Sequence, residues 1–98
     1  MVKHIVFWKF KDEALGGTKE ENMRKVQRML APLPELIEGL QSAEVGFNFH
    51  PAGFDLSLTA VLTDRDALAY YQDFPAHVEV KEFISEVTCD RAVVDYEV

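Results

Sequence analysis

The sequence predicts an α+β fold of the ferredoxin-like class, with its elements in the order βαββαβ. Strand-like segments show period-two alternation of apolar and polar residues, and the stretches between them carry apolar residues at three- and four-residue spacing. The length of 98 residues suits one domain. We therefore expect a single domain over residues 1–98, in which a four-stranded antiparallel sheet has its helices on one face.

The first predicted strand, Val2–Phe10, is apolar on both faces. One face carries Val2, His4, Val6, Trp8 and Phe10, and the other carries Lys3, Ile5, Phe7 and Lys9. Successive side chains of a strand point to opposite faces of its sheet. A strand with apolar residues on both faces therefore needs cover on both.

A capping box opens the first predicted helix. Thr18 is followed three residues later by Glu21, a spacing that satisfies the first free amides of a helix beginning near Lys19. The apolar residues on one side of this helix are Met23, Val26, Met29, Leu30 and Leu33. Pro32 lacks a backbone donor, so we expect regular helix to end near Ala31.

Two further strands form a predicted hairpin. Alternation resumes over Gln41–Phe49 and again over Phe54–Leu62, with turn-forming residues at 50–53 between them. The apolar face of the first of these strands carries Ala43, Val45, Phe47 and Phe49, and that of the second carries Leu56, Leu58, Ala60 and Leu62. Short connections of this kind join antiparallel neighbours.

The remaining residues predict two helical pieces and a last strand. Thr63 and Asp66 have the spacing of a second helix cap, and Pro75 interrupts the helical pattern that follows. A further helical piece is expected over residues 76–87, and a strand runs through residues 92–96. Helices on one face leave the other face of the sheet bare.

The bare face and the doubly apolar first strand together predict a homodimer. An apolar fraction of 48% in so short a chain leaves hydrophobic surface that the domain cannot bury by itself. A second copy packed sheet against sheet would cover this surface. We expect Phe47 to lie in the interface.

The charge balance disfavours several classes of partner. Ten Lys and Arg residues against 17 Asp and Glu residues give a net charge of −7 at neutral pH, which disfavours binding to nucleic acid and to anionic membrane surfaces. No apolar run approaches the roughly 20 residues of a membrane helix, and no signal-peptide pattern follows Met1. We expect a cytoplasmic protein whose single cysteine, Cys89, forms no internal disulfide.

The candidate chemistry centres on His77. The three histidines lack metal-ligand spacing and the glycines form no phosphate-binding loop, so we expect no metal and no cofactor. His77 follows Pro75 in the first turn of a helix, where an exposed histidine near free amides tends to stay neutral. Tyr71 lies six residues earlier, and a phenol beside a neutral imidazole could polarise a carbonyl and remove a proton. Capping and packing of the kink would explain the same histidine.

Three segments together resemble the stress-responsive dimeric α/β barrel (Dabb) domain. They are Val2–Lys11, Tyr71–His77 with its Pro-Ala-His sequence, and Val93–Tyr96, and they match in order and spacing over nearly the whole chain. The resemblance implies a ferredoxin-like protomer whose sheet packs against that of its twin to make a barrel. Plant members include heat-stable stress proteins and a polyketide cyclase that needs no cofactor, whereas many bacterial members have no assigned activity.

The resemblance also implies a set of site residues. The cyclase uses a tyrosine, a histidine and a carboxylate at positions matching Tyr71, His77 and Asp95, and a histidine of its first strand matches His4. We therefore expect Asp95 to accept a hydrogen bond from His77 or to lie within reach of it through one water molecule. Leu56 stands where the cyclase has a further pocket histidine, so the pocket is expected to be drier.

The function expected from these residues is the binding of a small carbonyl or aromatic ligand between the sheet and the helices. The expected lining residues are His4, Val6, Trp8, Leu58 and Tyr71. One alternative is a cofactor-independent cyclase, isomerase or lyase, in which His77 is the general base, Asp95 orients it and Tyr71 stabilises oxyanion charge. A second alternative is a cofactor-free oxygenase, which needs a substrate that itself reduces oxygen.

Overall fold

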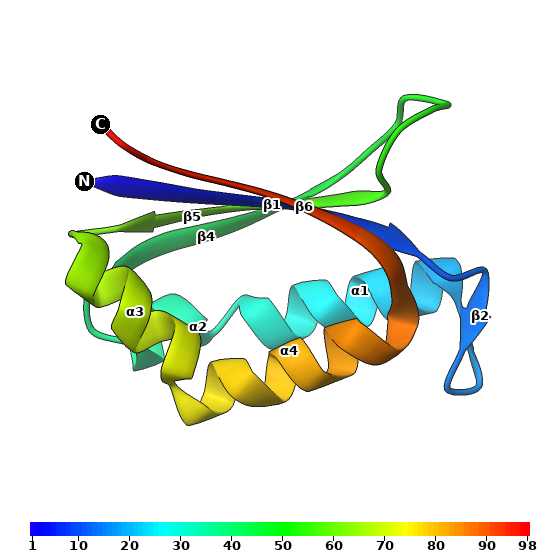
Figure 1. The fold of residues 1–98 in the computed structure, drawn as a ribbon. Coiled ribbons are helices and arrows are strands. Elements are labelled where there is room, and N and C mark those ends of the chain that lie inside the picture. Colours follow the sequence, from blue (N-terminus) through cyan, green and yellow to red (C-terminus); the bar gives the residue numbers. More distant parts are fainter.

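The computed structural model describes residues 1–98 and confirms the predicted βαββαβ order. The main sheet is antiparallel, in the strand order β4 (Leu40–Phe47), β5 (Leu56–Leu62), β1 (Val2–Phe10) and β6 (Thr88–Glu97). The helices are α1 (Lys19–Leu30), α2 (Leu33–Leu36), α3 (Arg65–Asp73) and α4 (Pro75–Val87). All of them lie on one side of the sheet (Figure 1), as predicted. A two-stranded ribbon of β2 (Glu13–Ala14) and β3 (Gly17–Thr18), which the sequence did not predict, precedes α1.

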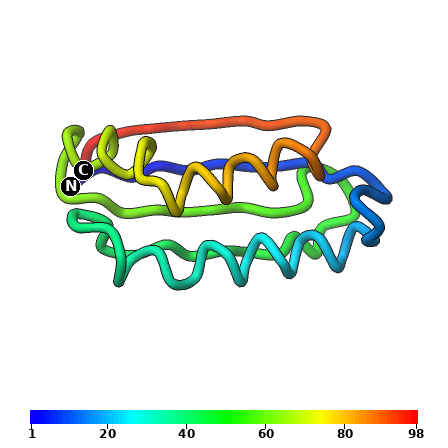
Figure 2. The backbone as a smooth tube through the Cα atoms, turned by 90° about the horizontal axis from the view of Figure 1, so that it is seen from below, coloured from blue at the N-terminus to red at the C-terminus, as the bar shows by residue number.

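The register of the strands fixes which residues face the helices. Val6 of β1 lies opposite Leu58 of β5 and Val93 of β6, so the three share one face. On that face the alternate residues of β1 and β5 are buried, in agreement with the predicted pattern. Helices α1 and α4 lie side by side beneath it (Figure 2) and close the core.

The first helix begins as predicted, whereas the cap of α3 is a different residue. Thr18 accepts a hydrogen bond from the Glu21 amide, and Glu21 in turn accepts one from the Thr18 amide. The predicted pair of Thr63 and Asp66 does not cap α3. Asp64 does, because its carboxylate accepts a hydrogen bond of 2.7 Å from the Ala67 amide.

The outer strand β4 corrects two predictions. It ends at Phe47 instead of Phe49, and Phe49 is fully exposed in the following loop. Phe47 pairs with Leu56, which is buried under the helices, so Phe47 belongs to the helix-covered face and not to the bare face. It stays exposed because it is the last residue of an edge strand. Its predicted place in a sheet-to-sheet interface is therefore wrong.

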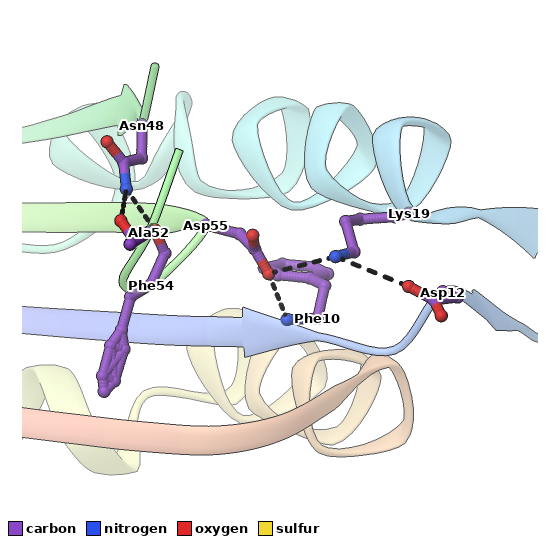
Figure 3. Close-up of polar contacts among 7 residues, drawn as sticks. All are labelled: Phe10, Asp12, Lys19, Asn48, Ala52, Phe54 and Asp55. Carbon is purple, nitrogen blue, oxygen red and sulfur yellow. Dashed lines mark hydrogen bonds and ion pairs between the residues drawn. The ribbon is translucent and has the colours of Figure 1, made fainter. Parts of the chain in front are cut away.

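Asp55 ties the loop before β5 to the end of β1 (Figure 3). Its carboxylate accepts a hydrogen bond of 2.8 Å from the Phe10 amide, and its own amide donates one of 2.9 Å to the Trp8 carbonyl. Lys19 lies 3.7 Å from the same carboxylate and 3.5 Å from that of Asp12. In the neighbouring turn the Asn48 side chain donates to the carbonyls of Ala52 and Phe54 (Figure 3). These contacts hold β1, β5 and the start of α1 together.

The bare face of the sheet carries an apolar surface. Ile5, Phe7, Val61 and Val94 point away from the helices, and Phe54 stacks on Phe7 with 6.0 Å between the ring centroids. Of these, Phe7 and Val94 are exposed. None of the helices is long and apolar enough to cross a membrane.

Replacing Gly39 by alanine should destabilise the fold. Gly39 has φ of +88°, and a Cβ atom there would lie 2.7 Å from the Cβ atom of Ala67 on α3. We expect Gly39→Ala to lower the free energy of unfolding by about 2 kcal/mol, from backbone strain and overpacking. Gly16→Ala is the matched control, because Gly16 has φ of +77° but open space around it, and it should lose about 1 kcal/mol. Urea unfolding measures both, and equal losses would contradict the steric explanation.

Candidate functional site

A cavity of about 320 Å³ lies between the sheet and the helices. Five of the residues predicted for a site line it, namely His4, Val6, Trp8, Leu58 and His77. The first three come from alternate positions of β1, and Leu58 faces the same side from β5. Tyr71 and Asp95 do not line the cavity, although each contacts a histidine that does.

The break between α3 and α4 positions His77. Pro75 begins α4, and Phe74 before it is extended, so the chain changes direction there. The amides of His77 and Val78 both donate to the Phe74 carbonyl at 2.9 Å. His77 then shares a helix face with Val80, Ile84 and Val87, all of which are buried. This spacing turns the imidazole toward the sheet.

His77 is buried, contrary to the exposed side chain predicted for the start of a helix. Only 4% of the residue is accessible, and its Nδ1 atom has no hydrogen-bond partner. Burial is the main cause that lowers the pKa of His77 to about 4, and the charges of Lys81 and His4 lower it further. The imidazole is therefore neutral at physiological pH, as predicted, but burial is the reason.

Tyr71 packs behind His77. The two rings are stacked with 4.0 Å between centroids and an angle of 23° between planes, and His4 lies edge-on to Tyr71 at 6.2 Å. Tyr71 is fully buried, its hydroxyl has no hydrogen-bond partner, and burial raises its pKa. A hydroxyl left unpaired in this way usually has an ordered water or a ligand as its partner.

Asp95 is bonded to His4 and not to His77. Its carboxylate lies 2.5 Å from the Nδ1 atom of His4, across a pair of directly opposed residues in the β1–β6 ladder. The predicted hydrogen bond between Asp95 and His77 is therefore wrong. A carboxylate that accepts the Nδ1–H of a histidine fixes the tautomer, so Nε2 is the ring nitrogen left for a ligand.

The cavity has a polar rim that the sequence analysis missed. Its members are Gln72, Lys81, Ser85, Thr88 and Arg91. Helical spacing could have identified two of them, because Lys81 and Ser85 follow His77 at successive intervals of four residues. Arg91 could be identified only from the register of β1 and β6, which places it opposite Trp8 on the helix-covered face.

A second hollow, of about 380 Å³, has a different character. It is lined by Phe7, Gly46, Phe47, Asn48, Phe54, Leu56 and Ser57, none of which titrates near neutral pH. Leu56 therefore lies in this hollow and not in the histidine-lined cavity. No group of three or more His, Cys, Asp or Glu side chains is arranged to hold a metal ion.

Comparison with solved structures identifies close neighbours of the fold. A dimeric ferredoxin-like protein of unknown function from Bacteroides fragilis is 31% identical, with a TM-score of 0.88 over 99% of this chain and 95% of that one. At3g17210 from Arabidopsis thaliana is 24% identical, with a TM-score of 0.84 over 100% and 95% of the two chains. A hydroxynitrile lyase from Passiflora edulis is 18% identical, with a TM-score of 0.81 over 99% and 92%.

The sequence itself places the chain in a family. No functionally curated protein matches it. Residues 2–98, which include the whole sheet and every helix, match the Stress responsive A/B Barrel Domain. The fold, the strand order and the three segments that carry the resemblance agree with this match, and the chain belongs to the Dabb family.

Proposed function

We propose that this protein binds a small carbonyl or aromatic ligand in the cavity lined by His4 and His77. The observation that carries the proposal is the unpartnered Nδ1 atom of His77, a buried side chain on the cavity wall. A buried polar atom without a partner costs free energy, which a ligand that supplies the missing hydrogen bond would recover. Trp8, Val6 and Leu58 add an apolar wall for the body of the ligand.

Acetophenone, a neutral aromatic ketone, is a suitable probe for this proposal. We expect it to shift the NMR signals of the Trp8 indole and the His77 ring, with little effect on Phe47 and Phe54 in the second hollow. Ser85 is exposed on the rim, so Ser85→Phe should weaken binding about tenfold or more by narrowing the entrance. Ser85→Ala is the matched control. Shifts confined to the second hollow, or equal affinities of the two variants, would contradict the proposal.

A second candidate function, proton transfer on a carbonyl compound, is favoured by the contact between Asp95 and His4. A histidine held through Nδ1 by a carboxylate presents Nε2 as a base, and the carboxylate stabilises the imidazolium that forms. In this step the C–H bond next to the carbonyl breaks and the proton moves to Nε2. The electron pair passes to the carbonyl oxygen as an enolate. This geometry favours His4 over His77 as the base.

Exchange of the acetophenone methyl protons into D2O tests this second function. The wild-type chain should exchange them faster than buffer. His4→Asn should return the rate to that of buffer, while its side-chain amide takes the place of Nδ1 as the donor to Asp95. His77→Gln separates the two histidines, because loss of exchange in this variant alone would make His77 the base. An unchanged ketone in the wild-type sample leaves ligand binding as the function.

The solved neighbours bear on the two candidate functions and on the oligomeric state of the chain. The Passiflora edulis neighbour acts as a hydroxynitrile lyase, but at 18% identity it shares the fold alone, so both candidates rest on this chain's own residues. No feature of the cavity favours the oxygenase alternative. Neighbours from Bacteroides fragilis, Thermobifida fusca and Jannaschia are described as dimeric.

We also propose that this chain forms a homodimer through the bare face of its sheet. The apolar surface of Ile5, Phe7, Val61 and Val94 lies on the face of the sheet opposite the helices, where no helix covers it (Figure 1). Surfaces of this kind on small domains are commonly protein interfaces. Sheet-to-sheet packing would bury the surface and leave the histidine-lined cavity on the helical side of each protomer.

A further inference from the structure

The rim of the histidine-lined cavity concentrates positive charge in an acidic chain. Lys81 and Arg91 both line the cavity, whereas none of the 17 Asp and Glu residues does. The chain as a whole has a net charge of −7, so this region departs from the charge of its surroundings. Clefts lined by one sign of charge raise the local concentration of ligands of the opposite sign.

Lys81 is held in place by the break between α3 and α4. Its Nζ atom donates to the Gln72 carbonyl at 2.6 Å and lies 3.4 Å from the Gln72 Oε1 atom. Both acceptors are neutral, and none of the ion pairs of the chain involves Lys81. The Lys81 charge also helps to lower the pKa of His77. The ammonium group is therefore close enough to act electrostatically on groups inside the cavity.

Arg91 approaches from the opposite wall. It lies on edge strand β6 across from Trp8, and its guanidinium makes no hydrogen bond or ion pair within the chain. A free guanidinium presents a planar set of donors that fits a carboxylate in a bidentate manner.

We propose that the ligand of this cavity is a carboxylate, whose anionic group binds between Lys81 and Arg91 while its apolar or carbonyl part reaches His77. This inference rests on the proposed binding function and specifies its ligand class. His77 supplies the second, independent feature, because this buried residue lines the same cavity and its Nδ1 atom has no hydrogen-bond partner. The four apolar lining residues favour a monocarboxylate with a hydrophobic body over a small inorganic anion.

The experiment compares benzoate with its neutral isostere benzamide by NMR titration. We expect benzoate to bind more tightly to the wild-type chain, and its affinity to fall as salt is added. Lys81→Gln and Arg91→Gln should each weaken benzoate binding about threefold to tenfold and should weaken benzamide binding by a smaller factor. Arg24→Gln, which removes one charge from an exposed position on α1, is the matched control and should affect neither probe.

The pKa of His77 distinguishes benzoate bound in the cavity from benzoate that is attracted only loosely to positive charge on the surface. A carboxylate held near His77 should raise the pKa of that imidazole, because an anion stabilises its protonated form, and benzamide should not. Equal affinities for the two probes, with shifts at Trp8 and His77, would overturn the carboxylate proposal and leave the binding function standing. If neither probe shifts these residues, both proposals fail.

Discussion

The Val94→Lys variant should be monomeric at concentrations where the unmodified chain is a dimer. Val94 lies opposite Ile5 on the bare face of the sheet and is 54% exposed in the single chain. In a sheet-to-sheet interface the new ammonium group would lose its water without gaining a partner. We expect this to cost about 3 kcal/mol or more, which raises the dissociation constant of the dimer by more than about a hundredfold.

Val93→Lys is the control for this prediction, because it makes the same change one residue earlier on the same strand. Val93 lies opposite Val6 on the helix-covered face and is 38% exposed. Its lysine should leave the dimer intact. Light scattering and analytical ultracentrifugation report the mass of each variant. A dimeric Val94→Lys variant with an unchanged melting temperature would show that the bare face is not the interface.

The stability of the fold should fall with acidification because His77 is buried in its neutral form. Burial lowers the pKa of His77 from 6.5 to about 4 in the folded chain. Between these two values the unfolded chain binds a proton at this position that the folded chain does not, so protonation favours unfolding. The contribution is fully present above pH 6.5 and is lost as the pH falls toward 4, a total of about 3 kcal/mol.

Urea unfolding at a series of pH values measures this contribution. His77→Phe should be less sensitive to pH between 6.5 and 4, because no buried imidazole remains to be protonated. Comparison of slopes allows for a general change in stability caused by the aromatic replacement. The prediction would be contradicted if His77→Phe retained the full wild-type slope.

Elements defined by neighbouring residues were predictable from the sequence. The capping box of Thr18 and Glu21 and the alternation of Val2–Phe10 both occur where predicted. These signals work because a helix cap and a strand face depend on residues a few positions apart. The cap of α3 was predicted wrongly, because Asp64 lies beside Thr63 and is an equally good hydrogen-bond acceptor.

The burial of His77 could also have been predicted. Val80, Ile84 and Val87 follow it at intervals of three or four residues, so the apolar face of α4 includes position 77. Its position in the first turn of a helix, where polar residues are usually exposed, predicted an exposed side chain instead, and that prediction was wrong. Packing of the apolar face against the sheet determined the orientation, and the pKa of His77 followed from that burial.

The sequence by itself determined the fold class, the family and five of the residues that line the cavity. Only the tertiary structure revealed the polar rim and decided how the site residues are paired. His4 and Asp95 are 91 positions apart, and they meet because the register of β1 and β6 places them directly opposite each other. The same register sets Arg91 on the cavity rim, and the register of β4 and β5 sets Phe47 on the helix-covered face. Periodicity assigns a residue to one of two faces relative to its neighbours, whereas a one-residue change of register reverses every assignment on the strand. Contacts between strands distant in sequence therefore depend on the packing of the whole sheet.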